Sequence, residues 1–481
     1  MKSRSRILQL LGMTALLAAT PLAAVYYQPT MHDPDIWWRL RVGEFIATTH
    51  SFPHTAIFSR FAATNSWETH SWFFDLLIWL TYKWFSLPGL PTFLFIFQIA
   101  IAAAMVGSLT LISQSWWKGL LLSAICLTAC FHTLAPRAAL FTVLLFILVM
   151  AVIFKDLRER RVRAMYWLPL IFFVWANCHI QFVNGFVVLG MLCACEFLQH
   201  FIAANVANSS PDLPWSKILL IFAGCVLATL VNPYSWHLYE IIWGYLTKAG
   251  QWDQIVELLA PDFRRPAHYV ELLMAGWAAW SLGARRTHSL FRISLLIVSA
   301  IISFHAIREA WMVAIVASFL IAESEAGIKD FGKLDIPVIA TAAALALAIS
   351  LAAQVQVGFT NQKLIAELDR TFPVRAVSFV ADTHPPGPIY NSMNWGGYLI
   401  FNLREYPVAM DGRNEAYGGD ISESNRVADG LPGWKQDKTF ASSNLVLIEK
   451  NFPLARLLSA DSDFKLVYAD HLAKVFIRVR R

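Results

Sequence analysis

Charged residues are scarce in this chain. Asp, Glu, Lys and Arg make up 15% of the 481 residues, whereas hydrophobic residues make up 57%. A soluble core of this size would not bury so much apolar surface, so the composition predicts a polytopic membrane protein. The net charge is +6, but the basic residues fall largely in short clusters between apolar runs, as in cytoplasmic loops. We therefore expect no nucleic-acid partner.

Cysteine is also scarce. All six cysteines lie within or at the ends of apolar segments, and none follows residue 358. This distribution argues against disulfides in the less apolar tail. The pairs Cys126/Cys130 and Cys193/Cys195 lack partners at zinc-ligand spacing, so we interpret the cysteines as small buried hydrophobic residues.

Common nucleotide-binding and hydrolase motifs are missing. The chain has no Gly-rich phosphate loop, no His-Glu-x-x-His pattern and no Gly-x-Ser-x-Gly elbow. The sequence therefore gives no support for ATP-driven transport or for the chemistry of common soluble hydrolases.

Apolar runs dominate what remains. A span needs about 20 apolar residues to cross a bilayer core of about 30 Å, and fewer when flanking side chains snorkel. The first run follows the basic stretch 1–6 and mimics a signal peptide, but we interpret it as an uncleaved first helix with a cytoplasmic N-terminus. The sequence predicts eleven spans, at about 7–27, 89–112, 117–133, 138–155, 164–181, 184–203, 216–232, 268–283, 290–306, 308–323 and 336–356.

The short aromatic run from Trp72 to Phe85 is not among the spans. It carries Asp75 and Lys83, and counting it as a crossing would turn the basic loop 155–163 outward, against the positive-inside rule. We predict an interfacial helix on the outer face instead.

The predicted domains follow from this topology. A transmembrane domain covers residues 1–357 and includes an outer loop, 28–88, with interfacial helices. The tail, 358–481, alternates short strands and helices and predicts a small α/β domain whose last two strands form a hairpin. After eleven crossings this domain would be extracytoplasmic. The predicted strands are 388–390, 406–410, 444–448, 465–468 and 473–477, with helices near 373–382, 395–403, 424–440 and 453–460.

Polar residues gather at the predicted outer ends of the helices and indicate a cavity that opens outward. Each residue also has a simpler interpretation, because an arginine can snorkel to headgroups and His179 can be a satisfied histidine at a helix end. The candidate substrate-binding residues on this side are His70, Arg137, His179, Gln181, Arg308 and Glu309.

The acidic motif Asp33-Pro34-Asp35 opens the outer loop, and Trp37 and Trp38 follow it. Tryptophan is enriched at membrane interfaces, and two nearby carboxylates can act as general base and charge partner or hold a divalent cation. A helix start explains the same residues, with Asp33 as N-cap and Pro34 in the first turn. If Asp33 caps the helix, Asp35 is the better candidate for the base.

Two clusters stand out in the tail, Asn394–Tyr398 and Met410–Arg413. Their glycines allow tight turns at strand ends or close approach to a ligand. If they form a binding edge, Arg413 is the natural anion ligand.

The order of these features resembles the integral-membrane glycosyltransferases of the GT-C class, which use polyprenyl-phosphate-linked or polyprenyl-diphosphate-linked sugars. One span leads from a cytoplasmic N-terminus into an outer loop that contains Asp33-Pro34-Asp35, Gly43-Glu44-Phe45-Ile46, Pro53, a helix at 70–86 and Pro88-Gly89. The resemblance covers about the first 110 residues and, beyond them, the general architecture. It implies that Asp33 or Asp35 is the catalytic base. Pro34 and the tryptophan pair depart from the Asp-Glu pairing of several members and leave open which carboxylate acts and whether metal is needed.

The implied function is sugar transfer from a lipid-linked donor to an outer-face acceptor that is a lipid, glycan or protein. We expect an integral protein of a bacterial inner membrane, in contact with membrane lipid. The alternatives are a non-catalytic transport or assembly protein, and a degenerate GT-C-like protein that binds a lipid carrier. The cofactor is not determined by the sequence, although a divalent cation could bind at Asp33 and Asp35.

Overall fold

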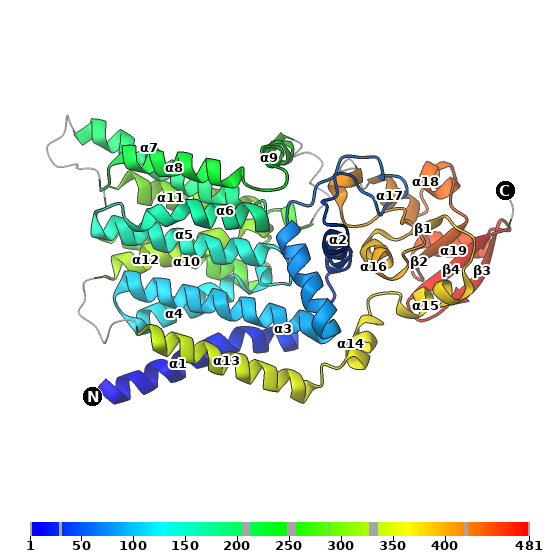
Figure 1. Ribbon diagram of the computed structural model, residues 1–481, viewed down its shortest axis with the longest axis horizontal. Helices are drawn as coiled ribbons and strands as arrows, with labels where there is room; N and C mark the ends of the chain where they lie inside the picture. The colour runs from blue at the N-terminus through cyan, green and yellow to red at the C-terminus, as the bar shows by residue number, and fades with distance from the viewer. Residues whose placement is uncertain are drawn as a thin grey trace. The chain divides into compact units, whose positions relative to one another are not determined.

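The computed structural model describes residues 2–27, 31–203, 212–247, 256–287, 289–326, 335–417 and 422–479. It divides into two compact units (Figure 1). We call Met1–Gln28 with Leu94–Gln356 the helical unit, and Pro29–Phe93 with Val357–Arg481 the mixed unit. The first predicted outer loop therefore folds with the C-terminal part of the chain.

Each of the eleven predicted spans contains a helix. Five helices are long and apolar enough to cross a membrane: α1, α3, α5, α7 and α13. The polytopic helical architecture is thus confirmed, while the number of crossings stays a prediction. The bounds are α1 Lys2–Tyr27, α3 Trp72–Ser113, α4 Trp116–Ala129, α5 Ala139–Glu159, α6 Leu168–Cys178, α7 Phe182–Ala203, α8 Trp215–Thr229, α10 Pro266–Ala284, α11 Leu290–His305, α12 Trp311–Ser324 and α13 Ile336–Val357. A further helix, α9, covers His237–Thr247.

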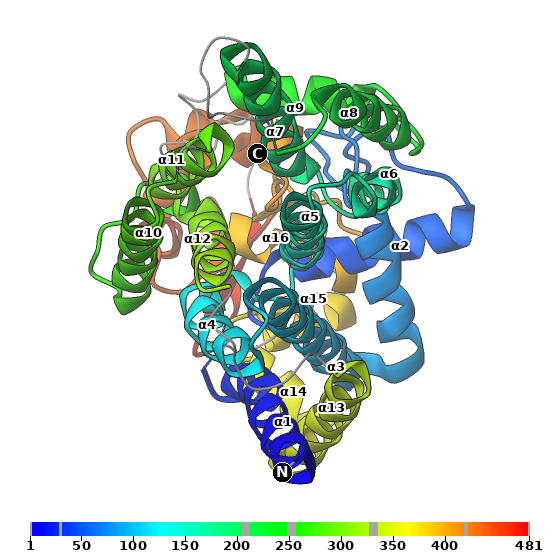
Figure 2. The ribbon, with the colours of Figure 1, turned by 90° about the vertical axis from the view of Figure 1, so that its left-hand side faces the viewer.

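The centre of the helical unit is α12. Its sequence is apolar on all sides, and its residues from Trp311 to Ala322 are buried. A helix that is apolar all round needs neighbours on every side. Here they are α4, α5, α10 and α11, which run beside it (Figure 2).

The helix α3 bends at Ser86, whose backbone angles are not helical (φ 54°, ψ −155°). Pro88 follows two residues later, and proline disfavours helical geometry in the residue before it and removes a helical N–H donor. The bend separates the predicted interfacial segment, 72–85, from the predicted span, 89–112. The sequence therefore located both helical segments and the break between them.

Polar contacts within the helical unit join loops that were assigned to the same side of the membrane. The alternating topology predicts this grouping, because consecutive helices carry their loops to opposite ends. Loops expected inside are joined by Lys118–Glu325, Arg160–Asp212 and Arg292–Asp212, and loops expected outside by Arg137–Glu257 and Gln181–Glu309. Which end faces the cytoplasm stays a prediction.

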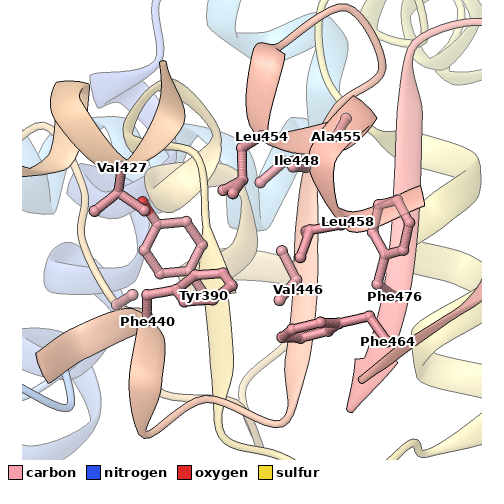
Figure 3. Close-up of a cluster of buried hydrophobic side chains, with 11 residues drawn as sticks. Tyr390, Val427, Phe440, Val446, Ile448, Leu454, Ala455, Leu458, Phe464 and Phe476 are labelled. Carbon is pink, nitrogen blue, oxygen red and sulfur yellow. The ribbon is translucent and has the colours of Figure 1, made fainter. Parts of the chain in front are cut away.

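The mixed unit contains a four-stranded sheet in the order β1-β2-β4-β3. β1 (Ile389–Asn391) and β2 (Leu445–Glu449) are parallel, whereas β4 (Ala473–Arg478) is antiparallel to β2 and to β3 (Phe464–Ala469). The predicted terminal hairpin is therefore correct. Figure 3 shows the apolar core that β2, β4 and nearby helices enclose, including Val446, Leu458 and Phe476. The helices are α14 Asn361–Leu368, α15 Val374–Thr383, α16 Met393–Asn402, α17 Ser422–Ala428, α18 Lys438–Ala441 and α19 Pro453–Ala460.

Two predicted elements of the tail are wrong. Residues 406–410 do not join the sheet, because Val408 exchanges backbone hydrogen bonds with Phe58 and Arg60 of the first loop instead. The single helix expected near 424–440 is two short helices, α17 and α18, separated by a stretch in which Gly430 and Gly433 adopt left-handed backbone angles.

The helix α2 (Asp35–Thr49) attaches the first loop to α16. Trp37 is 2% exposed, and its ring centroid lies 5.8, 5.0 and 5.8 Å from those of Phe372, Tyr398 and Phe401. Trp38 is 5% exposed. Both indoles are therefore buried inside the mixed unit, and a site at a membrane face beside them stays a prediction.

Replacing Trp37 should destabilise the mixed unit. We expect Trp37→Ala to lower its free energy of unfolding by about 3–5 kcal/mol, since it removes a large buried ring from an aromatic cluster. Limited proteolysis within residues 357–481 measures the effect. Trp84→Ala is the matched control, because Trp84 belongs to the same unit and is 68% exposed. Equal proteolytic sensitivity of the two variants would contradict the prediction.

Candidate functional site

The acidic motif forms the start of α2. The Asp35 backbone N–H donates to Asp33 Oδ1 at 3.0 Å, and the helix begins at Asp35, immediately after Pro34. Asp33 therefore binds a backbone N–H group at the helix entrance. Its predicted assignment as N-cap is wrong, because Pro34 takes the N-cap position and the first helical residue is Asp35. This occupation favours Asp35 over Asp33 as a base.

The Asp35 side chain is half-buried against two residues. Trp38 Nε1 donates to Asp35 Oδ1 at 2.9 Å. A Cβ atom built on Gly412 would lie 2.2 Å from the same oxygen, so the Asp35 carboxylate lies directly against the Gly412 backbone. The sequence did not predict this contact, which joins residues far apart in the chain.

Arg413 is fully buried in an ion pair. Its Nε and Nη2 donate to Asp411 Oδ1 and Oδ2, each at 2.8 Å, and Tyr417 donates to Oδ2 at 2.7 Å. The guanidinium lies 4.8 Å from the Trp67 ring centroid. Only Nη1 has no hydrogen-bond partner among the described residues. The role of Arg413 as an anion ligand stays a prediction, and the observed contacts give it a structural role.

Because of the Asp411–Arg413 pair, we expect the mixed unit to become less stable in acid. Burial raises the pKa of Asp411, but the Arg413 charge and the hydrogen bonds outweigh burial and hold that pKa below its ordinary value. The stabilisation is therefore complete above about pH 3.9, the unfolded-state pKa, and is lost as the pH falls through the lower folded-state pKa. Thermal unfolding of the mixed unit between neutral pH and pH 3 should show this loss. Asp411→Asn should show a weaker pH dependence, and an equal dependence would contradict the assignment.

A second ion pair in the mixed unit was missed by the sequence analysis. Arg39 Nη1 donates to Asp75 Oδ1 at 2.9 Å, and Thr69 Oγ1 donates to Asp75 Oδ2 at 2.5 Å. Asp75 is fully buried. An acidic residue in an aromatic run was the available signal, but its partner lies 36 residues away. The predicted site residue His70 is half-buried in the turn that precedes α3.

The helical unit brings some of the other predicted residues together. The side-chain amides of Gln181 and Asn184 donate to the two carboxylate oxygens of Glu309, with Asn184 at 3.1 Å. Gln181 and Glu309 are therefore direct neighbours. His179 is buried and has a separate partner, with its Nδ1 2.8 Å from Thr142 Oγ1.

The two predicted arginines of the helical unit differ. Arg137 forms an ion pair with Glu257. Arg308 is exposed and forms no ion pair with the residues that the structure describes. Arg308 is therefore the more available cation for an anionic ligand.

Metal binding has no preformed site within the described ranges. No group of three or more His, Cys, Asp or Glu side chains in this part of the chain could hold a metal ion. A cation held by Asp33 and Asp35 would need ligands from elsewhere, and it stays a prediction.

Comparisons with known proteins place the fold. No protein-family model matches the sequence, and no curated protein matches it. The apo structure of the Archaeoglobus fulgidus oligosaccharyltransferase is similar with a TM-score of 0.55 and 12% identity, over 93% of this chain and 69% of that one. ArnT from Cupriavidus metallidurans, bound to undecaprenyl phosphate, has a TM-score of 0.49 and 13% identity, over 96% of this chain and 97% of that one.

The first similarity extends over both units of the chain, well beyond the 110 residues that carried the resemblance in sequence. At this low identity it concerns the fold and not the activity. This chain with apolar, membrane-length helices therefore shares the fold of that oligosaccharyltransferase over 93% of its length, in line with the resemblance to the GT-C glycosyltransferases seen in the sequence.

Proposed function

We propose that the protein is a membrane glycosyltransferase that moves a sugar from a polyprenyl-phosphate-linked donor to an acceptor on the outer face of the membrane. One observation carries the proposal. In a chain with the GT-C fold, the half-buried Asp35 carboxylate lies at the start of the first loop helix, in a loop that follows the first apolar helix. Asp35 is the proposed catalytic base, and Asp33 supports the helix start.

The chemistry requires a proton acceptor and a cation. The acceptor oxygen attacks the anomeric carbon of the sugar while Asp35 takes the proton of that oxygen. The bond between the anomeric carbon and the phosphate oxygen breaks, and the polyprenyl phosphate leaves with its negative charge. Guanidinium groups stabilise such a charge through paired N–H donors. Arg308 and Arg137 stay candidates for binding the donor phosphate within the helical unit, where Arg308 is exposed and Arg137 pairs with Glu257.

The remaining predicted residues are proposed to bind substrate. Gln181 and Glu309 form one polar group in the helical unit that can recognise sugar or acceptor hydroxyls, and His179 lies nearby in sequence. His70 and Arg413 are the candidates in the mixed unit. The proposed location is a bacterial inner membrane, with the N-terminus in the cytoplasm and residues 358–481 outside, because the basic loops favour the cytoplasm.

A transfer assay tests the proposal. Purified full-length protein would be incubated with polyprenyl-phosphate donors that carry different labelled sugars, together with acceptors from a membrane extract. We expect label in an acceptor and release of polyprenyl phosphate from at least one donor. If folded protein transfers sugar from no donor, the catalytic proposal fails and the GT-C-like lipid-carrier binder becomes the better explanation.

A further inference from the structure

Three glycines of the C-terminal segment are not explained by turn geometry. Gly396 and Gly397 lie inside α16, and neither they nor Gly412 has a positive φ angle. Glycine is therefore not required at these positions for a left-handed backbone, and glycine inside a helix costs roughly 0.5–1 kcal/mol relative to alanine. A different constraint must explain these residues.

The constraint is close approach. A Cβ atom on Gly412 would lie 2.2 Å from Asp35 Oδ1, and one on Gly397 would lie 2.4 Å from the Pro34 carbonyl oxygen. A Cβ atom on Gly396 would lie 2.1 Å from the Met410 carbonyl oxygen. These distances are far shorter than van der Waals contact. The missing side chains thus allow residues 34–35, 396–397 and 410–412 to meet.

The segment that carries Gly412 is fixed on both sides. Before it, Asn391 Nδ2 donates to the Met410 carbonyl at 2.8 Å, and Asn391 Oδ1 accepts the Ala409 N–H at 2.8 Å. After it, the Arg413 N–H donates to Asp411 Oδ1 at 2.9 Å, beside the two side-chain bonds of the ion pair. Gly412 therefore has little freedom to move away from Asp35.

An aromatic contact connects the ion pair to the same carboxylate. The Arg413 guanidinium lies over Trp67, and the Trp67 ring meets the Trp38 ring edge to face at 5.8 Å between centroids. Trp38 in turn donates to Asp35 Oδ1. The same carboxylate oxygen thus contacts both the Gly412 backbone and the Trp38 indole.

We propose that Gly397, Gly412 and the Asp411–Arg413 ion pair are positioning residues for the acidic motif, so that the C-terminal segment sets the location of the Asp35 carboxylate. The inference rests on the proposed catalytic role of Asp35 for its functional meaning. Its structural content, the placement of that carboxylate, can be measured without the reaction.

Gly412→Ala tests the effect on catalysis. The added methyl group must displace Asp35 or the 410–413 segment, and a shift of about 1 Å at a reacting group can cost about 100-fold in rate. We expect kcat to fall by about that factor, since the proposed base no longer lies where it takes the proton of the acceptor. Gly276→Ala is the matched control, because nothing in the described structure lies within 4 Å of a Cβ atom there. Equal kcat values in the two variants would overturn the proposal.

A chemical probe gives a readout that does not depend on transfer. Carbodiimide with a labelled amine converts accessible carboxylates to amides, and mass spectrometry reports the extent at each residue. We expect labelling of Asp35 to rise several-fold in Gly412→Ala and to stay unchanged in Gly276→Ala. Unchanged labelling in both variants would overturn the positioning role. Altered labelling in a protein that transfers no sugar would instead retain the positioning role and contradict the proposed function.

A milder variant covers the case in which Gly412→Ala does not fold. Trp38→Phe keeps a ring against Trp67 but removes the N–H that donates to Asp35. Trp37→Phe is its control, because Trp37 Nε1 is buried and has no hydrogen-bond partner among the described residues. We expect increased Asp35 labelling and a lower kcat in Trp38→Phe only. The same labelling in both tryptophan variants would count against the proposal.

Discussion

Asp35→Asn should lower sugar transfer about 1,000-fold, because general-base catalysis typically contributes 10²–10⁴-fold to a rate. The asparagine side chain has the same shape, and its oxygen can still accept the Trp38 Nε1 hydrogen bond. It cannot take a proton from the acceptor. The expected result is therefore a folded, membrane-inserted protein that binds donor and does not transfer sugar, measured in the labelled-donor assay.

Asp33→Asn is the internal control for this prediction. The side-chain oxygen of asparagine can accept the same hydrogen bond, so the bond to the Asp35 N–H should persist. We expect a much smaller loss of transfer than in Asp35→Asn. A larger loss in Asp33→Asn would assign the base to Asp33. Undiminished transfer by both single variants and by the double variant would remove the motif from catalysis.

The helices of the membrane part could be predicted because their signal is local. An apolar run of sufficient length needs only its own residues to be recognised, and α12, which is apolar on all sides, was located in this way. The break at Ser86 was also accessible, since Pro88 and the charged residues Asp75 and Lys83 mark a change of environment within one aromatic run.

Contacts between distant segments could not be predicted. The strand expected at 406–410 is a short, largely apolar stretch, but its backbone partner is the first loop, about 350 residues earlier. The same limit applies to the glycines. Asp411-Gly412-Arg413 looked like a turn, whereas the space at Gly412 is occupied by Asp35. The sequence shows that a residue is glycine, but only the fold shows which atoms lie where its side chain would be.

The candidate site contains contacts that could be predicted from the sequence and others that could not. Gln181 and Glu309 were grouped by their predicted side of the membrane, and they form a hydrogen bond. The side of a loop follows from counting crossings, so this grouping was available from the sequence. The burial of Trp37 and of Arg413 could not be predicted from the sequence, because partners from other parts of the chain enclose both side chains.

Arg413→Ala should destabilise the mixed unit by about 3–5 kcal/mol, since removal of one partner leaves the other charge buried and uncompensated. Both side chains of the Asp411–Arg413 pair are inaccessible to solvent. The variant also removes the guanidinium that covers Trp67. Thermal unfolding of the mixed unit measures the loss of stability, with proteolytic cleavage within residues 357–417 as the signal that the unit has unfolded.

Two comparisons distinguish this effect from a general cost of losing an arginine. Arg404 is half-exposed and pairs with Glu44 in the same unit, so Arg404→Ala should cost less than about 1 kcal/mol. The double variant Asp411→Asn with Arg413→Gln leaves no buried charge and should be more stable than Arg413→Ala alone. If Arg413→Ala is no less stable than Arg404→Ala, the buried pair does not hold the 410–413 segment. Asp35 would then lose the support that this segment is proposed to provide.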